Sequence, residues 1–71
     1  MGMEKTYRKH NLKQEWYCFE AERTVVVCND ERKMVAVFGY YVQTDIAKYS
    51  EPCEESEFTQ QIESVLNLIR S

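Results

Sequence analysis

Residues 14–42 read QEWYCFEAERTVVVCNDERKMVAVFGYYV, and this stretch decides the fold. It contains three runs rich in β-branched and aromatic residues, a composition that favours pleated strands. The runs cover residues 14–21, 24–28 and 33–42. A polar Asn-Asp pair follows the second run and favours turn geometry. The sequence therefore predicts an antiparallel β-meander of three or four strands.

Side chains alternate between the two faces of a strand, so the first run presents two different faces. Tyr17 lies on one face, while Trp16 and Cys18 lie on the other. A hairpin centred near Arg23 would place Cys18 opposite Cys28 on the second strand. The third run is apolar on both faces, which indicates a strand that is covered on both sides.

Residues 51–70 have the pattern of one amphipathic helix. Pro52 suits a first helical turn, where its missing N–H is not needed, and the glutamates around it complement the positive end of the helix dipole. The apolar residues fall on a single side and are Phe58, Ile62, Val65, Leu66, Leu68 and Ile69. The expected fold class is thus α+β: a three- or four-stranded antiparallel β-meander with one C-terminal amphipathic helix packed on one face.

Two segments give weaker patterns. Residues 1–13 are polar and carry a net charge of +3, from Lys5, Arg8, Lys9 and Lys13 against Glu4. We expect a flexible basic arm there, or an edge strand around residues 5–10. Residues 43–50 fit either a loop or the end of a fourth short strand.

The size and the cysteines bound the class of protein. Seventy-one residues form one domain, and a chain this short is marginally stable without a metal, a disulfide or a partner. Secreted proteins of this size usually carry an even set of cysteines, whereas this chain has three. It also begins with a polar segment, unlike a signal peptide. We expect a cytoplasmic protein with free thiols and no membrane-spanning segment.

No group of residues has the spacing of a known reaction centre. His10, Cys18, Cys28 and Cys53 could ligate a soft metal, but structural zinc sites draw their ligands from closely spaced pairs. Cys53 lies near an expected helix N-terminus, where a thiol pKa can fall, yet the neighbouring glutamates oppose a thiolate. We therefore predict no metal, no cofactor and no enzymatic activity.

One segment bears on nucleic-acid binding. Residues 33–40 resemble in part the aromatic core strand of RNA-recognition sheets, in which aromatic side chains stack on bases. Lys33, Ala36 and Tyr40 fit that pattern, but valines stand at the two inner aromatic positions. The net charge of −3 disfavours binding driven by phosphates. The alternative hypothesis is a nucleic-acid-associated accessory protein that uses the sheet aromatics and contacts from Lys5, Arg8, Lys9 and Lys13.

The leading hypothesis rests on unbalanced burial. One helix covers one face of a sheet, while the third strand is apolar on both faces. The residues expected on the uncovered face are Trp16, Val35, Val37 and Tyr41. Exposed apolar patches of this kind mark interaction surfaces. We therefore predict a small non-catalytic intracellular interaction or regulatory module that uses this face to bind protein, most simply a second copy of itself in a two-fold contact. The alternative fold is a sheet that continues across a two-fold axis in a homodimer.

Overall fold

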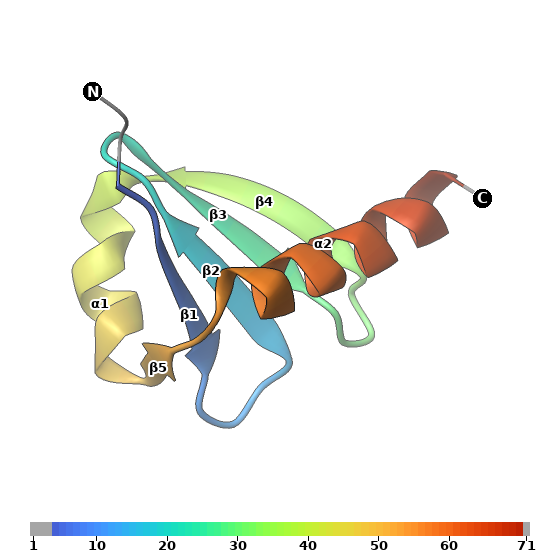
Figure 1. Ribbon diagram of the computed structural model, residues 1–71, viewed down its shortest axis with the longest axis horizontal. Helices are drawn as coiled ribbons and strands as arrows, with labels where there is room; N and C mark the ends of the chain where they lie inside the picture. The colour runs from blue at the N-terminus through green and yellow to red at the C-terminus, as the bar shows by residue number, and fades with distance from the viewer. Residues whose placement is uncertain (1–3, 71) are drawn as a thin grey trace.

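The computed structural model describes residues 4–70 and confirms the α+β class, with an antiparallel sheet and a C-terminal helix on one of its faces (Figure 1). The sheet has five strands in the order β4-β3-β2-β1-β5, and a second, short helix follows β4. The strands are β1 Thr6–His10, β2 Glu15–Phe19, β3 Arg23–Cys28, β4 Met34–Gly39 and β5 Ser50–Pro52. The helices are the 3-10 turn η1 Tyr40–Val42, α1 Gln43–Lys48 and α2 Glu55–Arg70.

Strands β2, β3 and β4 form the expected meander, but the predicted register of the first hairpin is wrong. Cys18 lies opposite Val25, not opposite Cys28. The Glu20 N–H donates to the Arg23 carbonyl at 2.9 Å, so Ala21 and Glu22 form the turn and the hairpin is centred between them. The predicted division of faces is confirmed, because Trp16 and Cys18 pack in one core and Tyr17 packs in the other.

Of the two expectations for this segment, a strand is confirmed at residues 6–10 and a flexible arm is wrong there. The strand β1 lies inside the sheet between β2 and β5, not at its edge. Tyr7 anchors this strand beneath α2, with its ring centroid 5.5 Å from that of Phe58. The strand looks polar in sequence because it contains Arg8 and Lys9. The charged end of Arg8 binds Ser50, and that of Lys9 lies over the Trp16 ring. Residues 1–3 of the expected arm lie outside the described residues.

The segment after β4 differs most from expectation. Strand β4, the third strand expected from the sequence, ends at Gly39. The chain then turns through η1 into α1, so residues 43–50 are mainly helical. A Cβ at Gly39 would lie 2.6 Å from the Tyr41 ring, so the Tyr41 side chain occupies the space beside this glycine. Val42, Ile46 and Tyr49 recur at the spacing of one helix face, and this was the overlooked signal.

Pro52 belongs to β5, not to the first turn of α2 as predicted. Proline cannot donate a hydrogen bond and so suits an edge strand, and β5 is the edge beside β1. The helix begins three residues later at Glu55, and its single-sided apolar stripe is confirmed. Phe58 and Val65 are buried against the sheet.

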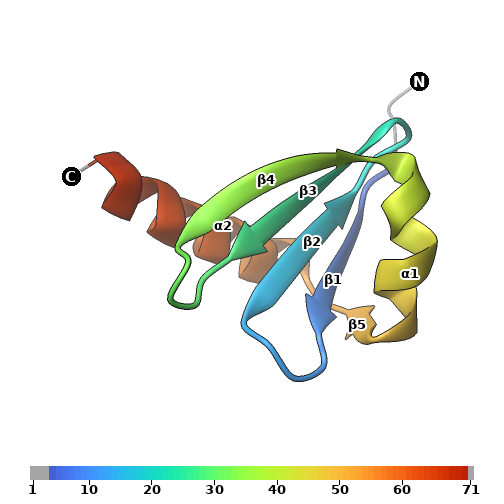
Figure 2. The same ribbon diagram turned by 180° about the vertical axis from the view of Figure 1, so that it is seen from behind.

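The sheet separates two apolar clusters. The cluster between α2 and the sheet consists of Trp16, Cys18 and Val27 from the strands and Phe58 and Val65 from the helix. The opposite face packs against α1 through Tyr17, Val26, Cys28 and Ile46. Figure 2 shows α1 standing beside this second face, along the end of the sheet formed by β1 and β5. Within residues 4–70, no helix is long and apolar enough to cross a membrane.

Candidate interaction surface

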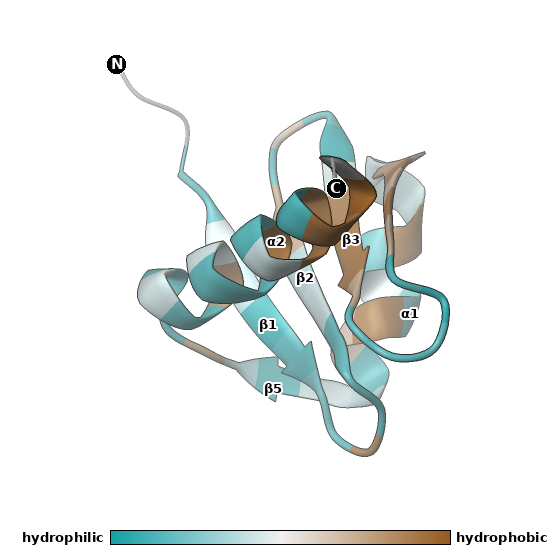
Figure 3. Ribbon diagram, turned by 90° about the vertical axis from the view of Figure 1, so that its right-hand side faces the viewer, coloured by the Kyte–Doolittle hydropathy of each residue, from teal (hydrophilic) through white to brown (hydrophobic). Residues whose placement is uncertain are grey.

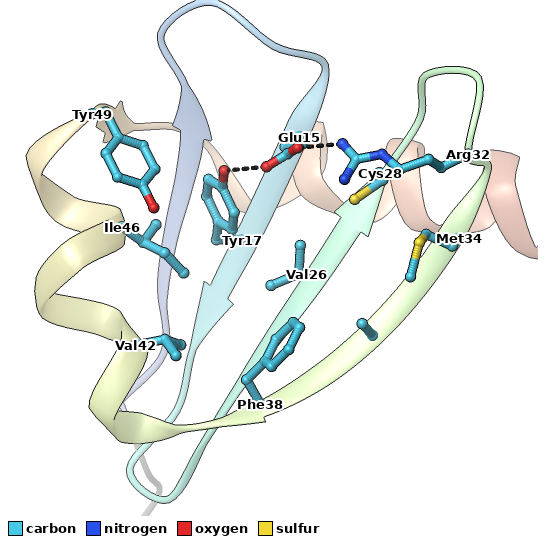
Figure 4. A pocket seen from close by; sticks show the side chains of 11 residues that line it. Glu15, Tyr17, Val26, Cys28, Arg32, Met34, Phe38, Val42, Ile46 and Tyr49 are labelled. Atoms are coloured by element: carbon cyan, nitrogen blue, oxygen red, sulfur yellow. Dashed lines mark hydrogen bonds and ion pairs between the residues drawn. The ribbon is translucent and has the colours of Figure 1, made fainter.

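A groove lies on the α1 side of the sheet, with a volume of about 280 Å³. Its floor comes from β2, β3 and β4, and α1 forms one wall (Figure 4). The apolar lining residues include Tyr17, Val26, Met34, Phe38 and Ile46. The short helix covers only part of this face, so the groove stays open toward β4.

A polar cluster closes one end of the groove. The Tyr17 hydroxyl donates to Glu15 Oε1 at 2.7 Å, and Glu15 Oε2 accepts a charged hydrogen bond from Arg32 (Figure 4). Arg32 also binds Asp30 at 2.7 Å. Burial raises the pKa of Tyr17 strongly, and its bond to the Glu15 carboxylate adds to that shift. The Tyr17 hydroxyl, the Glu15 carboxylate and the Arg32 guanidinium each have a partner within the cluster, so the cluster holds these side chains in place.

The candidate metal ligands do not come together. Cys18 and Cys53 belong to the core beneath α2, whereas Cys28 lies on the opposite face. The His10 Nδ1 atom accepts the N–H groups of Leu12 and Lys13, both at 3.0 Å, and thereby shapes the loop after β1. No cluster of metal-ligating side chains occurs in the part of the chain that the structure describes.

The three cysteines are free thiols, as predicted. Burial raises the pKa of each thiol. At Cys53 the nearby carboxylates of Glu57 and Glu54 raise the thiol pKa further. A protonated thiol is a poor nucleophile and a poor ligand, so these environments disfavour cysteine chemistry.

The outer edge of β4 presents unpaired main-chain groups. The Glu20 N–H donates to the Arg23 carbonyl and the Asn29 N–H donates to the Gln14 carbonyl, so the odd-numbered residues of β3 point their main-chain groups toward β2. The even-numbered residues of β3 therefore point their main-chain groups toward β4. By the same alternation, Val35 and Val37 direct their N–H and C=O groups away from β3. Among the described strands, none pairs with this side of β4.

Apolar side chains surround that edge on both faces of the sheet. Each is between 40% and 59% exposed: Met34, Val37, Phe38, Leu68 and Ile69. We call this set the β4 surface. The last two come from the C-terminal end of α2, which extends past β4 and is strongly hydrophobic (Figures 1 and 3).

The structure separates the four residues predicted as an interface. Trp16 is 6% exposed and packs beneath α2 with Val35, and Val37 lies on that same face. The prediction that these three lie on the face opposite the helix is therefore wrong. Helix α2 covers the face of the sheet on which Trp16 lies. Side-chain alternation divides the residues between two faces but does not show which face the helix covers. Val37 and Tyr41 are exposed, at 59% and 71%. The sequence missed Met34, Phe38 and the end of α2 because it could not show that β4 is an edge.

The basic residues proposed as nucleic-acid contacts do not form one face. Arg8 donates to the Ser50 hydroxyl at 2.8 Å and to the Ser50 carbonyl at 2.7 Å, on the α1 side. Lys9 lies on the other side, with its Nζ atom 5.7 Å from the Trp16 ring centroid. Lys5 and Lys13 are exposed near opposite ends of β1. The positive charge is thus dispersed.

Comparison with protein-family models, with curated proteins and with solved structures finds no match to this chain. Function is therefore inferred from the geometry of the chain itself.

Proposed function

We propose that this chain is a small non-catalytic interaction or regulatory module that binds protein through the β4 surface and associates with itself. The observation that supports the proposal best is the β4 edge, where unpaired main-chain groups lie between two sets of exposed apolar side chains. Edges of this kind are templates for pairing with another chain. Exposed apolar side chains beside them add affinity when they leave water.

A cytoplasmic setting is part of the same proposal. Its support is the state of the cysteines, since all three are free and two of them are buried in strands. Stable free thiols are typical of reducing compartments.

The alternative, a nucleic-acid-associated protein, receives less support from the geometry. Phosphate binding needs concentrated positive charge, whereas Arg8 and Lys9 point to opposite faces and are engaged with Ser50 and Trp16. A salt series separates the two hypotheses. Association through apolar side chains should change little between low and high salt, while binding to a generic single-stranded oligonucleotide should weaken steeply.

The direct test is light scattering of the purified chain over a range of micromolar concentrations. We expect a mass that rises with concentration and is nearly independent of salt. A mass that stays monomeric throughout, combined with tight salt-dependent oligonucleotide binding, would favour the alternative.

A further inference from the structure

The composition of β4 is unusual for a sheet edge. Natural edge strands are commonly protected by a charged residue, a proline or a bulge. The six residues Met34–Gly39 contain no charged residue and no proline, and their register with β3 is continuous. The opposite edge of the sheet, β5, is three residues long and contains both Glu51 and Pro52. Only the β4 edge is therefore suited to accept another strand.

The end of α2 gives a second, independent observation. Val65 packs against the sheet with Val35 nearby, and the helix then continues past the β4 edge (Figure 1). Leu68 and Ile69, one turn farther on, are 53% and 58% exposed. On the same face Val37 is 59% exposed. The fold thus has an apolar helix end that extends beyond the sheet, and an apolar strand residue with little helix above it.

We infer that the occupant of this edge is a second copy of the chain, paired β4 to β4 in antiparallel orientation to give a ten-stranded sheet. The inference rests on the proposed function and specifies its partner and geometry. The two-fold axis must run perpendicular to the sheet, because that operation makes two identical edge strands antiparallel. It also keeps α2 of both copies on the same face.

This symmetry restricts the register. Opposed residues in a sheet share a face, so under the two-fold axis a residue can lie opposite itself but not opposite its neighbour in sequence. By the same alternation Gly39 also points its main-chain groups outward, but its carbonyl already accepts the Thr24 hydroxyl at 3.0 Å. The register that pairs Val35 with Val37 and leaves Gly39 to that bond places Ala36 opposite Ala36 of the second copy. Val35 then lies opposite Val37 of the second copy, and each such pair exchanges both of its N–H···O bonds.

The side chains are compatible with this register. Met34 lies opposite Phe38 of the second copy on the groove face, a favourable sulfur–aromatic pair. Ala36, a small residue, lies at the two-fold axis and forms a non-hydrogen-bonded pair with its copy, the type of pair in which opposed residues approach most closely. On the other face, the end of α2 passes over Val35 and would cover Val37 of the second copy. One operation therefore satisfies the strand edge, the helix end and the exposed valine.

The area points to a dimer of moderate affinity. Five apolar side chains, each 40–59% exposed, would bury on the order of 500 Å² per copy. Standard stable interfaces bury about 800 Å² per partner, and transient ones bury less. We therefore expect a concentration-dependent dimer, not an obligate one.

The first test compares two lysine substitutions by analytical ultracentrifugation. Val37→Lys places a charge beneath the end of α2 of the second copy, but lysine is well tolerated at a free edge. Leu12→Lys is the matched control, because Leu12 is 92% exposed in the loop after β1, away from β4. We expect Val37→Lys to raise the dimer dissociation constant at least roughly 100-fold, since it acts twice in a two-fold interface. Leu12→Lys should behave as the wild type, and both variants should keep the wild-type circular dichroism spectrum.

The second test fixes the register by oxidative cross-linking in a Cys53→Ser background, with Cys18 and Cys28 buried. Ala36→Cys should give a covalent dimer, because opposed residues of a non-hydrogen-bonded pair have the spacing of a disulfide. Phe38→Cys, on the same face of the same strand and opposite Thr24 within its own chain, should not cross-link, because Met34 of the second copy lies opposite it.

The outcomes separate this inference from the proposal on which it rests. If the wild type dimerises and Val37→Lys dimerises equally well, the β4 pairing is overturned and self-association still stands. Equal cross-linking of the two engineered cysteine variants would have the same meaning. A wild-type chain that is monomeric at every concentration would overturn both the pairing and the self-association.

Discussion

The buried Tyr17 side chain shows how single residues shape the groove. It is 2% exposed, and its hydroxyl reaches Glu15 along the same strand. Arg32, from the turn before β4, completes the cluster. A buried hydroxyl and a partly buried carboxylate would each cost free energy without these partners. The cluster therefore holds the β2 end of the groove to the start of β4.

Glu15 should make the stability of the fold depend on acid. Burial acts to raise the pKa of this carboxyl, but the hydrogen bonds from Arg32 and Tyr17 outweigh it and leave the pKa below its usual value of 4.5. A lowered pKa in the folded state adds stability above pH 4.5 and loses it as the pH falls below that value. The loss of unfolding free energy between about pH 7 and about pH 3 should be smaller in Glu15→Gln than in the wild type.

The control for this measurement is Glu22→Gln, which changes an exposed carboxyl in the turn between β2 and β3. Its pH dependence should match that of the wild type. The pKa of Asp30 is also lowered, to about 2, by its hydrogen bonds with Arg32, so part of the acid loss should remain in Glu15→Gln. An identical acid profile in all three proteins would show that Glu15 contributes no linked stability.

At the scale of elements, α2 depends on two buried residues. Phe58 contacts Tyr7 of β1, and Val65 is fully buried against the sheet. Phe58→Ala should lower the free energy of unfolding by about 3–5 kcal/mol, enough to unfold much of a marginal domain. Denaturant titration measures it, with the exposed neighbour Thr59→Ala as the control. A Phe58→Ala midpoint equal to that of Thr59→Ala would contradict the packing of α2.

The short helix α1 depends on Arg8, because six residues are too few to form a stable helix alone. The Arg8 guanidinium binds Ser50 just after the helix and approaches the Ala47 carbonyl at 3.5 Å. Arg8→Met keeps most of the side-chain length but loses these bonds, and we expect a loss of about 1.5–3 kcal/mol. Chemical denaturation should show no such loss for Lys5→Met, whose side chain is exposed. Equal stability of the two variants would show that the bonds from Arg8 to Ser50 do not stabilise α1.

The elements differ in how far the sequence could predict them. The meander and α2 follow from long, consistent patterns of two and 3.6 residues. Helix α1 and strand β5 are short, and their formation depends on contacts with β1 that lie about 40 positions away in sequence. Local pattern contains no information about such contacts, so the sequence left both a flexible arm and an edge strand open for β1, which is held between β2 and β5.

For the whole molecule, the sequence predicted unbalanced burial but placed it on the wrong residues. Strand β4 is apolar on both faces, as expected, yet Trp16 and Val35 are covered by α2. The exposed apolar area instead follows the β4 edge, because β5 and β1 occupy the other side of the sheet. Strand order is a property of the whole fold, and only the structure identifies β4 as an edge strand that is paired on one side alone.

Coupling between association and folding gives a prediction for the intact molecule. A dimer that forms only from folded chains stabilises the native state, by about 2.7 kcal/mol when the partner is present at 100 times its dissociation constant. For a domain of this size, each kcal/mol shifts Tm by about 4–8 °C. The wild-type Tm should therefore rise on the order of 10 °C from the most dilute to the most concentrated samples in scanning calorimetry. Val37→Lys removes the association while leaving an exposed side chain, so its Tm should stay constant and equal the dilute wild-type value. A wild-type Tm that does not change with concentration would show that folding gains nothing from a second copy.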